Sequence, residues 1–273
     1  MLLEAEEIVA SQRKLLQDYF AGCVSLRSTV EGLESLSIFQ DTSPESGLSR
    51  LWSVILREAR NDRRNHDKLV DIVVSLSKRS APRTAQGATV VVYKMDVWKD
   101  LPMLGWEFRD HYNLSVNLDA PPDHRQEAVR EFVNMNRFAA SLKATGEEAF
   151  NYSWFALITL REALETKQRE AKEIDLAKLN SWLQAAAAWI EILGVEIFEW
   201  DEEFPSGFPH GAPGSGGDLW NGKHGFCEER WHLWRERFAG LAKSEKWAIE
   251  DDVRRVAGEA AIMMGEIEEG NVE

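Results

Sequence analysis

Apolar residues recur every three or four positions through most of the chain, which is the spacing of amphipathic helices. The longest repeat lies between residues 175 and 200, where the pattern continues for more than five helical turns. Its members are Leu176, Leu179, Leu183, Ala186, Ile190, Leu193 and Ile197. We therefore expect a central helix here, more deeply buried than any other.

Shorter apolar repeats predict the remaining helices, with one or two more expected before Phe39. The repeats cover residues 48–55, 69–76, 128–142, 150–164, 227–241 and 249–267. Residues 87–93 are rich in β-branched side chains and form the one β-like run, which is too little for a sheet. The pattern predicts an all-α fold, a single large bundle of about eight to ten helices.

Two segments predict loops, residues 77–86 and the Gly/Pro-rich residues 204–225 before the penultimate helix. The second loop contains seven Gly and three Pro, which make it costly to order. It also contains Phe204, Phe208 and Trp220, which a plain connection would not need. We expect these aromatic residues to anchor the loop as a lid.

The composition narrows the class of protein. Apolar residues make up 44% and charged residues 29%, which is typical of a globular chain. The formal net charge of -14 argues against nucleic acid and anionic membranes as partners. Two cysteines, an acidic N-terminus and no continuous apolar run of about 20 residues predict a cytoplasmic protein without a membrane span.

Metal and phosphate chemistry have little support. Residues 217–224 match the spacing of a phosphate-binding P-loop, but they follow a loop and end in His224 instead of Ser or Thr. His224, Glu228 and His232 are four residues apart, so neighbours could share a metal, yet first-turn acids and a solvated histidine explain them as well. We expect no metal and no cofactor.

The chain contains 11 tryptophans, several of them near polar residues in the sequence. They either fill a helical core or line a concave aromatic site, in which a few polar groups would orient a ligand. The candidate ligand-binding residues are Trp98, Trp106, Arg109, Asn134, Asn136, Trp220, Trp231 and Trp234.

Four motifs follow one another in a characteristic order. They are Trp98-Lys-Asp-Leu-Pro102, Asn134-Met-Asn136 continuing to Leu142, Ala187-Ala-Trp189, and Leu219-Trp220 leading to Trp234. Their order and spacing resemble the fungal helical family called domain of unknown function 3632. The resemblance covers about residues 97–241 and implies a helical fold and a fungal source. It assigns no activity, cofactor or catalytic residue and leaves the function open. We expect one domain over residues 1–273, with the helices of residues 1–80 packed on this region.

Two functions from different classes remain open. The first is a cofactor-independent protein, an enzyme or a binder, whose aromatic pocket takes a hydrophobic small molecule of the fungal metabolite type. Asp100, His224 and Glu229 would be its acid–base groups, and Arg230 would stabilise an anion. The second is a non-enzymatic helical interaction module, with a homodimer as one form. A closed aromatic pocket would favour the first, and a solid core with an exposed apolar groove the second.

Overall fold

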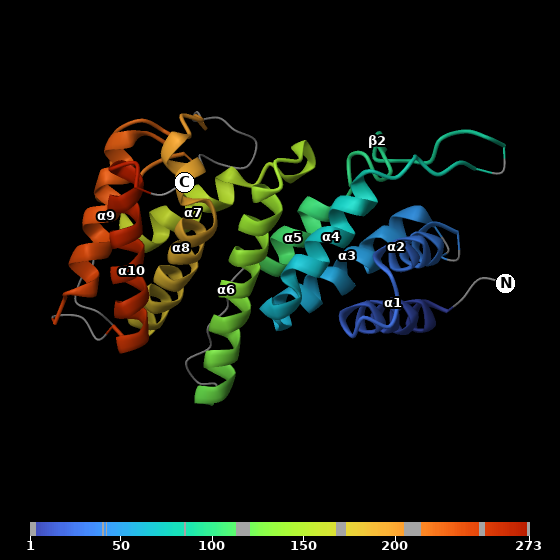
Figure 1. Ribbon diagram of the computed structural model, residues 1–273, viewed down its shortest axis with the longest axis horizontal. Coiled ribbons are helices and arrows are strands. Elements are labelled where there is room, and N and C mark those ends of the chain that lie inside the picture. The colour runs from blue at the N-terminus through green and yellow to red at the C-terminus, as the bar shows by residue number, and fades with distance from the viewer. Residues whose placement is uncertain are drawn as a thin grey trace. The chain divides into compact units, whose positions relative to one another are not determined.

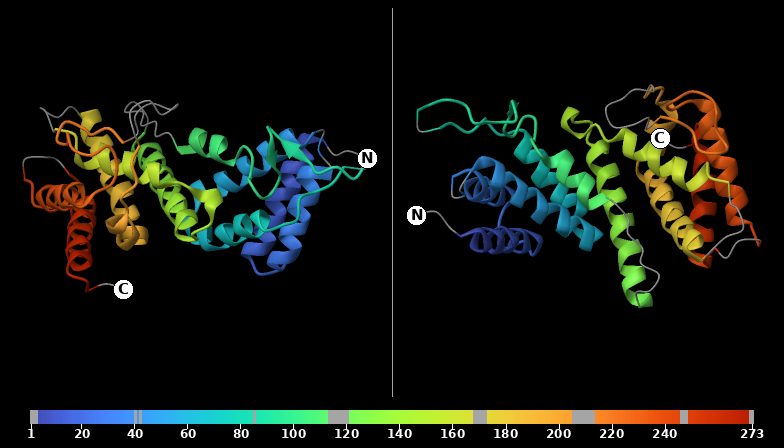
Figure 2. Two further views of the ribbon diagram at one scale, coloured as in Figure 1. Left: turned by 90° about the horizontal axis from the view of Figure 1, so that it is seen from above. Right: turned by 180° about the vertical axis from the view of Figure 1, so that it is seen from behind.

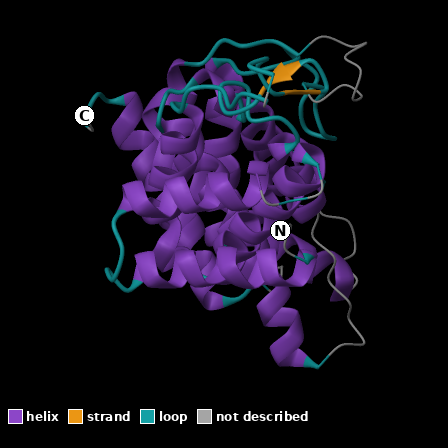
Figure 3. Cartoon of the chain, turned by 90° about the vertical axis from the view of Figure 1, so that its right-hand side faces the viewer, coloured by secondary structure: helices purple, strands orange, loops and turns teal. Residues whose placement is uncertain are grey.

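The computed structural model describes residues 4–271 except residues 40, 42, 85, 113–120, 168–172, 205–213 and 246–248. The described residues form ten α-helices and one two-stranded antiparallel hairpin (Figures 1 and 3). This confirms the all-α prediction. Contacts divide the chain into two compact units, Met1–Asn113 with Glu147–Phe150 and Leu114–Gly146 with Asn151–Glu273. The expectation of one domain over the whole chain stays a prediction.

Unit 1 is built around helix α3, which contacts three other helices and the turn that precedes it. Its helices are α1 (Ala5–Phe20), α2 (Leu26–Glu34), α3 (Pro44–Asn61), α4 (His66–Ser77) and α5 (Leu104–Tyr112), with a π-helical turn, η1, at Ser35–Phe39. The predicted apolar repeat of α3 is completely buried. Ser43 caps α3 by accepting a hydrogen bond from the Ser46 backbone N–H, and Pro44 occupies the first turn.

The β-like run of the sequence forms a hairpin instead of a lone strand. Strand β1 (Val91–Val92) pairs with β2 (Met95–Asp96), and Tyr93 and Lys94 connect them. Both connecting residues have positive φ, 51° and 66°, as a type I′ turn requires. Such turns normally contain Asn or Gly, so no turn signal predicted the second strand.

Unit 2 is built around helix α8, which packs on α6, α7 and α10, while α9 packs on α10 (Figures 1 and 2). The helices are α6 (Pro122–Ala144), α7 (Ser153–Leu164), α8 (Glu173–Glu199), α9 (Glu228–Ala242) and α10 (Asp251–Glu268). From Leu179 to Ile197 every predicted seam residue of α8 is buried, and Leu176 is half-buried. The sequence therefore located this core helix correctly.

The stretch Leu176–Glu199 of α8 is long and apolar enough to cross a membrane by length and composition. The sequence analysis expected no membrane span, because polar residues such as Gln184 and Glu191 interrupt the apolar run. The mean hydropathy of the stretch nevertheless stays high despite these interruptions. Sixty-one per cent of its most apolar window is buried. Packing against three helices accounts for this apolar character, as in any core helix.

Candidate functional site

The residues predicted to form one site are divided between the two units. Unit 1 contains Trp98, Asp100, Trp106 and Arg109, and unit 2 contains Asn134, Asn136, Trp220, His224, Glu229, Arg230, Trp231 and Trp234. Within each unit, some of these residues are core and others are exposed.

Trp98 belongs to the core of unit 1. Its ring is completely buried and stands edge-on to Trp52, with centroids 6.4 Å apart. Its indole N–H donates to Glu34 Oε1 at 2.9 Å, and the Trp52 N–H donates to the Pro102 carbonyl at 2.9 Å. Both indoles thus have protein partners, as buried tryptophans need.

Asp100 and Arg109 lie at the surface of the same unit. The Asp100 carboxylate accepts a hydrogen bond of 2.7 Å from the Asp96 backbone N–H. This contact fixes the chain as it leaves β2. It gives Asp100 a role in shaping the segment between the hairpin and α5.

The buried side chain of Asn136 links three helices of unit 2 through hydrogen bonds. Its Oδ1 accepts hydrogen bonds of 2.9 Å from Trp189 Nε1 and from Thr159 Oγ1, and its Nδ2 donates to the Phe132 carbonyl at 3.0 Å. Helices α6, α7 and α8 each contribute to this contact. Sequence analysis singled out Asn136 but not Thr159, because no pattern in the neighbouring residues distinguishes Thr159.

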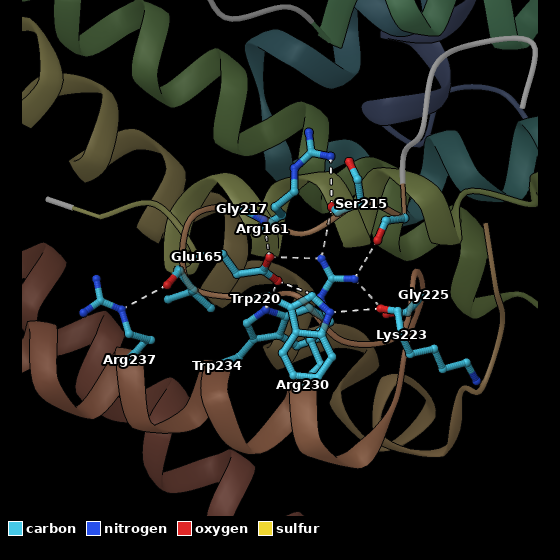
Figure 4. A network of polar contacts seen from close by, with 12 residues as sticks. Arg161, Glu165, Ser215, Gly217, Trp220, Lys223, Gly225, Arg230, Trp234 and Arg237 are labelled. Carbon is cyan, nitrogen blue, oxygen red and sulfur yellow. Dashed lines mark hydrogen bonds and ion pairs between the residues drawn. The ribbon is translucent and has the colours of Figure 1, made fainter. Parts of the chain in front are cut away.

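Arg230 and Glu165 form an ion pair in which both side chains are completely buried (Figure 4). Arg230 Nε donates to Glu165 Oε1 at 2.7 Å and Nη2 to Oε2 at 3.0 Å. Its remaining donors reach three backbone carbonyls, of Gly214 at 3.0 Å, Gly225 at 2.9 Å and Ser215 at 3.4 Å. The five N–H groups of the guanidinium are thereby all engaged within the protein.

Both carboxylate oxygens of Glu165 also accept hydrogen bonds within the protein. Besides those from Arg230, Glu165 accepts hydrogen bonds of 2.8 Å from Trp234 Nε1 and from the Gly217 backbone N–H. The Trp220 and Trp234 rings lie beside the guanidinium, with its carbon 5.6 and 5.4 Å from their centroids. With no donor or acceptor left for a ligand, this cluster holds the loop that precedes α9 against Glu165 at the end of α7. Sequence reasoning missed Glu165, which lies 65 residues from Arg230 without any local motif.

The described part of the Gly/Pro-rich loop, residues 214–225, is tied to the protein on both sides. The Leu219 backbone N–H donates to the Glu165 carbonyl at 2.9 Å, and the Phe204 N–H donates to the His224 carbonyl at 2.7 Å. Trp220 is half-buried, and its indole donates to the Lys223 carbonyl at 2.9 Å. Phe208 lies outside the described residues, and the lid role of the loop stays a prediction.

His224, shortly before α9, and Glu229, in the first turn of α9, are both exposed. The pKa of Glu229 is lowered, first by a hydrogen bond from its own backbone N–H and then by the Cys227 thiol. His232 Nε2 lies 4.0 Å from a Glu228 oxygen and 3.6 Å from a Glu268 oxygen. Among the described residues, no group of three His, Cys, Asp or Glu side chains could hold a metal ion. The absence of a metal site stays a prediction.

Trp231 completes the predicted aromatic set and is core as well. It is 1% exposed, and its ring lies 5.3 Å from that of Phe198. Its indole N–H has no hydrogen-bond partner among the described residues. Asn134 is also buried, on α6.

One aromatic pair is exposed instead of buried. Tyr93 and Trp106 are 59% and 53% exposed, and their rings meet edge-on with centroids 5.1 Å apart. Val91 on β1, in the same unit, is 49% exposed. We call the pair Tyr93 and Trp106 the aromatic surface. The sequence singled out Trp106 but assigned it to a pocket wall.

The chain around the aromatic surface is conformationally strained. All described non-glycine residues with positive φ lie between Tyr93 and Met103. They are Tyr93, Lys94, Trp98, Leu101 and Met103. Each such residue costs on the order of 1 kcal/mol or more and persists only where its surroundings enforce it, which is common at functional segments.

Fold and sites together define an all-helical protein whose conspicuous buried charges are engaged in holding its own structure. A family model described as Protein of unknown function (DUF3632) matches residues 52–238, and the chain belongs to this family. The match contains most of the region in which the sequence motifs showed the resemblance and begins earlier, in α3. No curated protein and no solved structure matches the chain.

Proposed function

We propose that the protein is a non-enzymatic helical interaction module that binds a protein partner through the aromatic surface. The exposed contact between Tyr93 and Trp106 is the observation that carries this proposal. Aromatic residues dominate the binding energy of protein interfaces, because they bury much area with few rotatable bonds. An apolar side chain of the partner would cover the two rings.

Preorganisation supports this role. Tyr93 is held on a two-residue turn, and Trp106 lies in the first turn of α5, so both rings start from fixed backbone positions. Binding then requires little ordering of the chain, which preserves affinity. The positive φ of Tyr93 and Lys94 belongs to this turn, which fixes the backbone that carries the Tyr93 ring.

The aromatic-pocket function has less support. Trp98 and Trp234 are buried with their indole donors on carboxylates, which is how core tryptophans are satisfied. Arg230 has no free donor for an anion, and Asp100 lies in the other unit. These contacts favour packing over substrate binding.

The test is affinity capture on the immobilised protein, with Trp106→Ser compared against Ile262→Ser. Ile262 is 64% exposed on α10 and provides an equivalent loss of apolar surface in unit 2. We expect a partner that the wild type and Ile262→Ser retain and that Trp106→Ser loses, with melting temperatures unchanged. Light scattering would show whether that partner is a second copy of the chain. Equal retention by all three proteins would refute the proposal.

A further inference from the structure

A cavity of about 210 Å³ lies in unit 1, bordered by helices α1, α3 and α5. Its lining consists of Val9, Arg13, Ser49, Arg50, Ser53, Val54, Arg57 and Glu107. The five residues from α3 follow one another at spacings of one, three, one and three, so they share one face of that helix. The cavity is therefore built on regular secondary structure, which fixes the backbone positions of its lining residues.

The lining is rich in positive charge, although the chain as a whole is acidic with a net charge of -14. It includes three guanidinium groups against one carboxylate. Arg50 pairs with the buried Asp41, and the Glu107 carboxylate accepts the Ser49 hydroxyl. In the described part of the chain, no carboxylate lies within ion-pair distance of Arg13 or Arg57. These two guanidinium groups are available to a ligand.

Positive charge from Arg57 and Arg60 also acts on His111, on α5. Its pKa is lowered by burial and then by Arg60 and Arg57, while Asp110 opposes the change. Arg57 and Arg60 near the end of α3 thus contribute positive charge, which attracts anions.

We propose that this cavity binds a small organic anion through Arg13 and Arg57, with the Ser53 hydroxyl as a further donor. A guanidinium donates paired hydrogen bonds to carboxylate and phosphate oxygens alike, so both anionic groups fit the chemistry. Glu107 repels a second anionic group and accepts from a hydroxyl, which favours ligands that combine one anionic group with hydroxyls.

The volume indicates the size of the group that the cavity can enclose. Since a water molecule takes about 30 Å³ of liquid, the cavity corresponds to roughly seven water molecules. Pockets for drug-sized ligands start at about 300 Å³. A three-carbon phosphate ester or hydroxy acid matches the available space, and this site is independent of the aromatic surface.

The experiment is isothermal titration of the full chain at low ionic strength with glycerol 3-phosphate, glycerate and glycerol. We expect at least one of the two anions to bind and neutral glycerol to give no signal. A preference for glycerol 3-phosphate would identify a phosphoryl site, and a preference for glycerate a carboxylate site. Absence of binding for both anions would overturn the proposal.

A matched pair of double variants locates the binding. Arg13→Gln with Arg57→Gln removes the two free guanidinium groups, and Arg27→Gln with Arg63→Gln removes the same charge from exposed positions outside the cavity. We expect at least tenfold weaker anion binding in the first pair and an unchanged affinity in the second, with melting temperatures checked for both. If the first pair does not fold, Arg57→Gln alone is compared with Arg63→Gln. Equal affinities in the cavity and control variants would place the binding elsewhere and refute the site.

Discussion

Arg230 carries a full charge without any exposure to solvent, and Glu165 is the group that makes this burial tolerable. The pair differs from a surface ion pair, because both side chains have lost their hydration and rely on protein partners alone. Four backbone carbonyls and N–H groups of the loop complete these partners, at Gly214, Ser215, Gly217 and Gly225. The energy of the pair is therefore coupled to the position of the loop.

Replacing Glu165 by Ala is expected to lower the free energy of unfolding by about 3–5 kcal/mol, because it leaves a buried guanidinium unpaired. The Trp234 indole and the Gly217 N–H lose their acceptor in the same variant. Glu259→Ala is the control, since Glu259 pairs with Arg255 on the surface of α10 and should cost less than about 1 kcal/mol. Urea unfolding measures both changes. Similar losses in the two variants would show that the buried pair does not hold unit 2 together.

His111 is half-buried, and its Nδ1 has no hydrogen-bond partner among the described residues. Burial, Arg60 and Arg57 lower its pKa below the ordinary value of 6.5. The unfolded chain therefore takes up the proton at a higher pH than the folded protein does. Stability contributed by neutral His111 is complete above pH 6.5 and falls as the pH drops below it.

We expect the wild type to lose more unfolding free energy than His111→Gln between pH 7.5 and pH 5.5. Urea titrations at the two pH values measure this difference. His124→Gln, at an exposed position on α6, should behave as the wild type does. An identical pH dependence in all three proteins would contradict the assigned role of His111.

At the scale of elements, the helices that the sequence predicted are those with long local repeats. Helix α8 was recognisable because its seam depends only on spacing within one segment. Helix α5 was missed because Leu104, Phe108 and Tyr112 cover barely two turns after the strained Met103. The partner strand β2 was missed because its turn contains Tyr and Lys.

The same limit applies to the candidate sites. Trp106 and Arg230 could be singled out from composition, but their partners Tyr93 and Glu165 could not. Those contacts depend on tertiary packing across many residues, which no local pattern encodes. The cavity-lining arginines were missed for the same reason, since Arg13 and Arg57 lie on different helices.

Helix α3 packs so closely on the preceding turn, η1, that only glycine fits at position 47. A Cβ at Gly47 would lie 1.8 Å from the Ser37 carbonyl oxygen, which belongs to the backbone and cannot rotate away. Gly47→Ala should therefore lower the unfolding free energy of unit 1 by about 1–3 kcal/mol.

Gly105→Ala is the matched control for this prediction. No atom lies within 4 Å of a Cβ at Gly105, on α5, and alanine favours helix by up to about 1 kcal/mol over glycine. Its melting temperature should stay constant or rise, whereas that of Gly47→Ala should fall. A Gly47→Ala protein as stable as the wild type would mean that α3 and η1 are less tightly packed than described.

At the scale of the whole molecule, each unit has its own aromatic core. The rings of the aromatic surface belong to unit 1 but are exposed instead of buried in its core. Three of the five tryptophans of the predicted site, Trp98, Trp231 and Trp234, lie in these cores, and the indoles of Trp98 and Trp234 donate to carboxylates. The central claim is therefore that binding occurs at the aromatic surface, away from the buried tryptophans.

Hydrogen exchange of the protein with and without its captured partner tests this claim most directly. We predict that the partner slows exchange at the backbone amides of the hairpin, residues 91–96, and of α5. Trp106→Ser should abolish this protection, and Ile262→Ser should leave it intact. Protection confined to unit 2, with unchanged exchange at the hairpin and α5, would contradict the account.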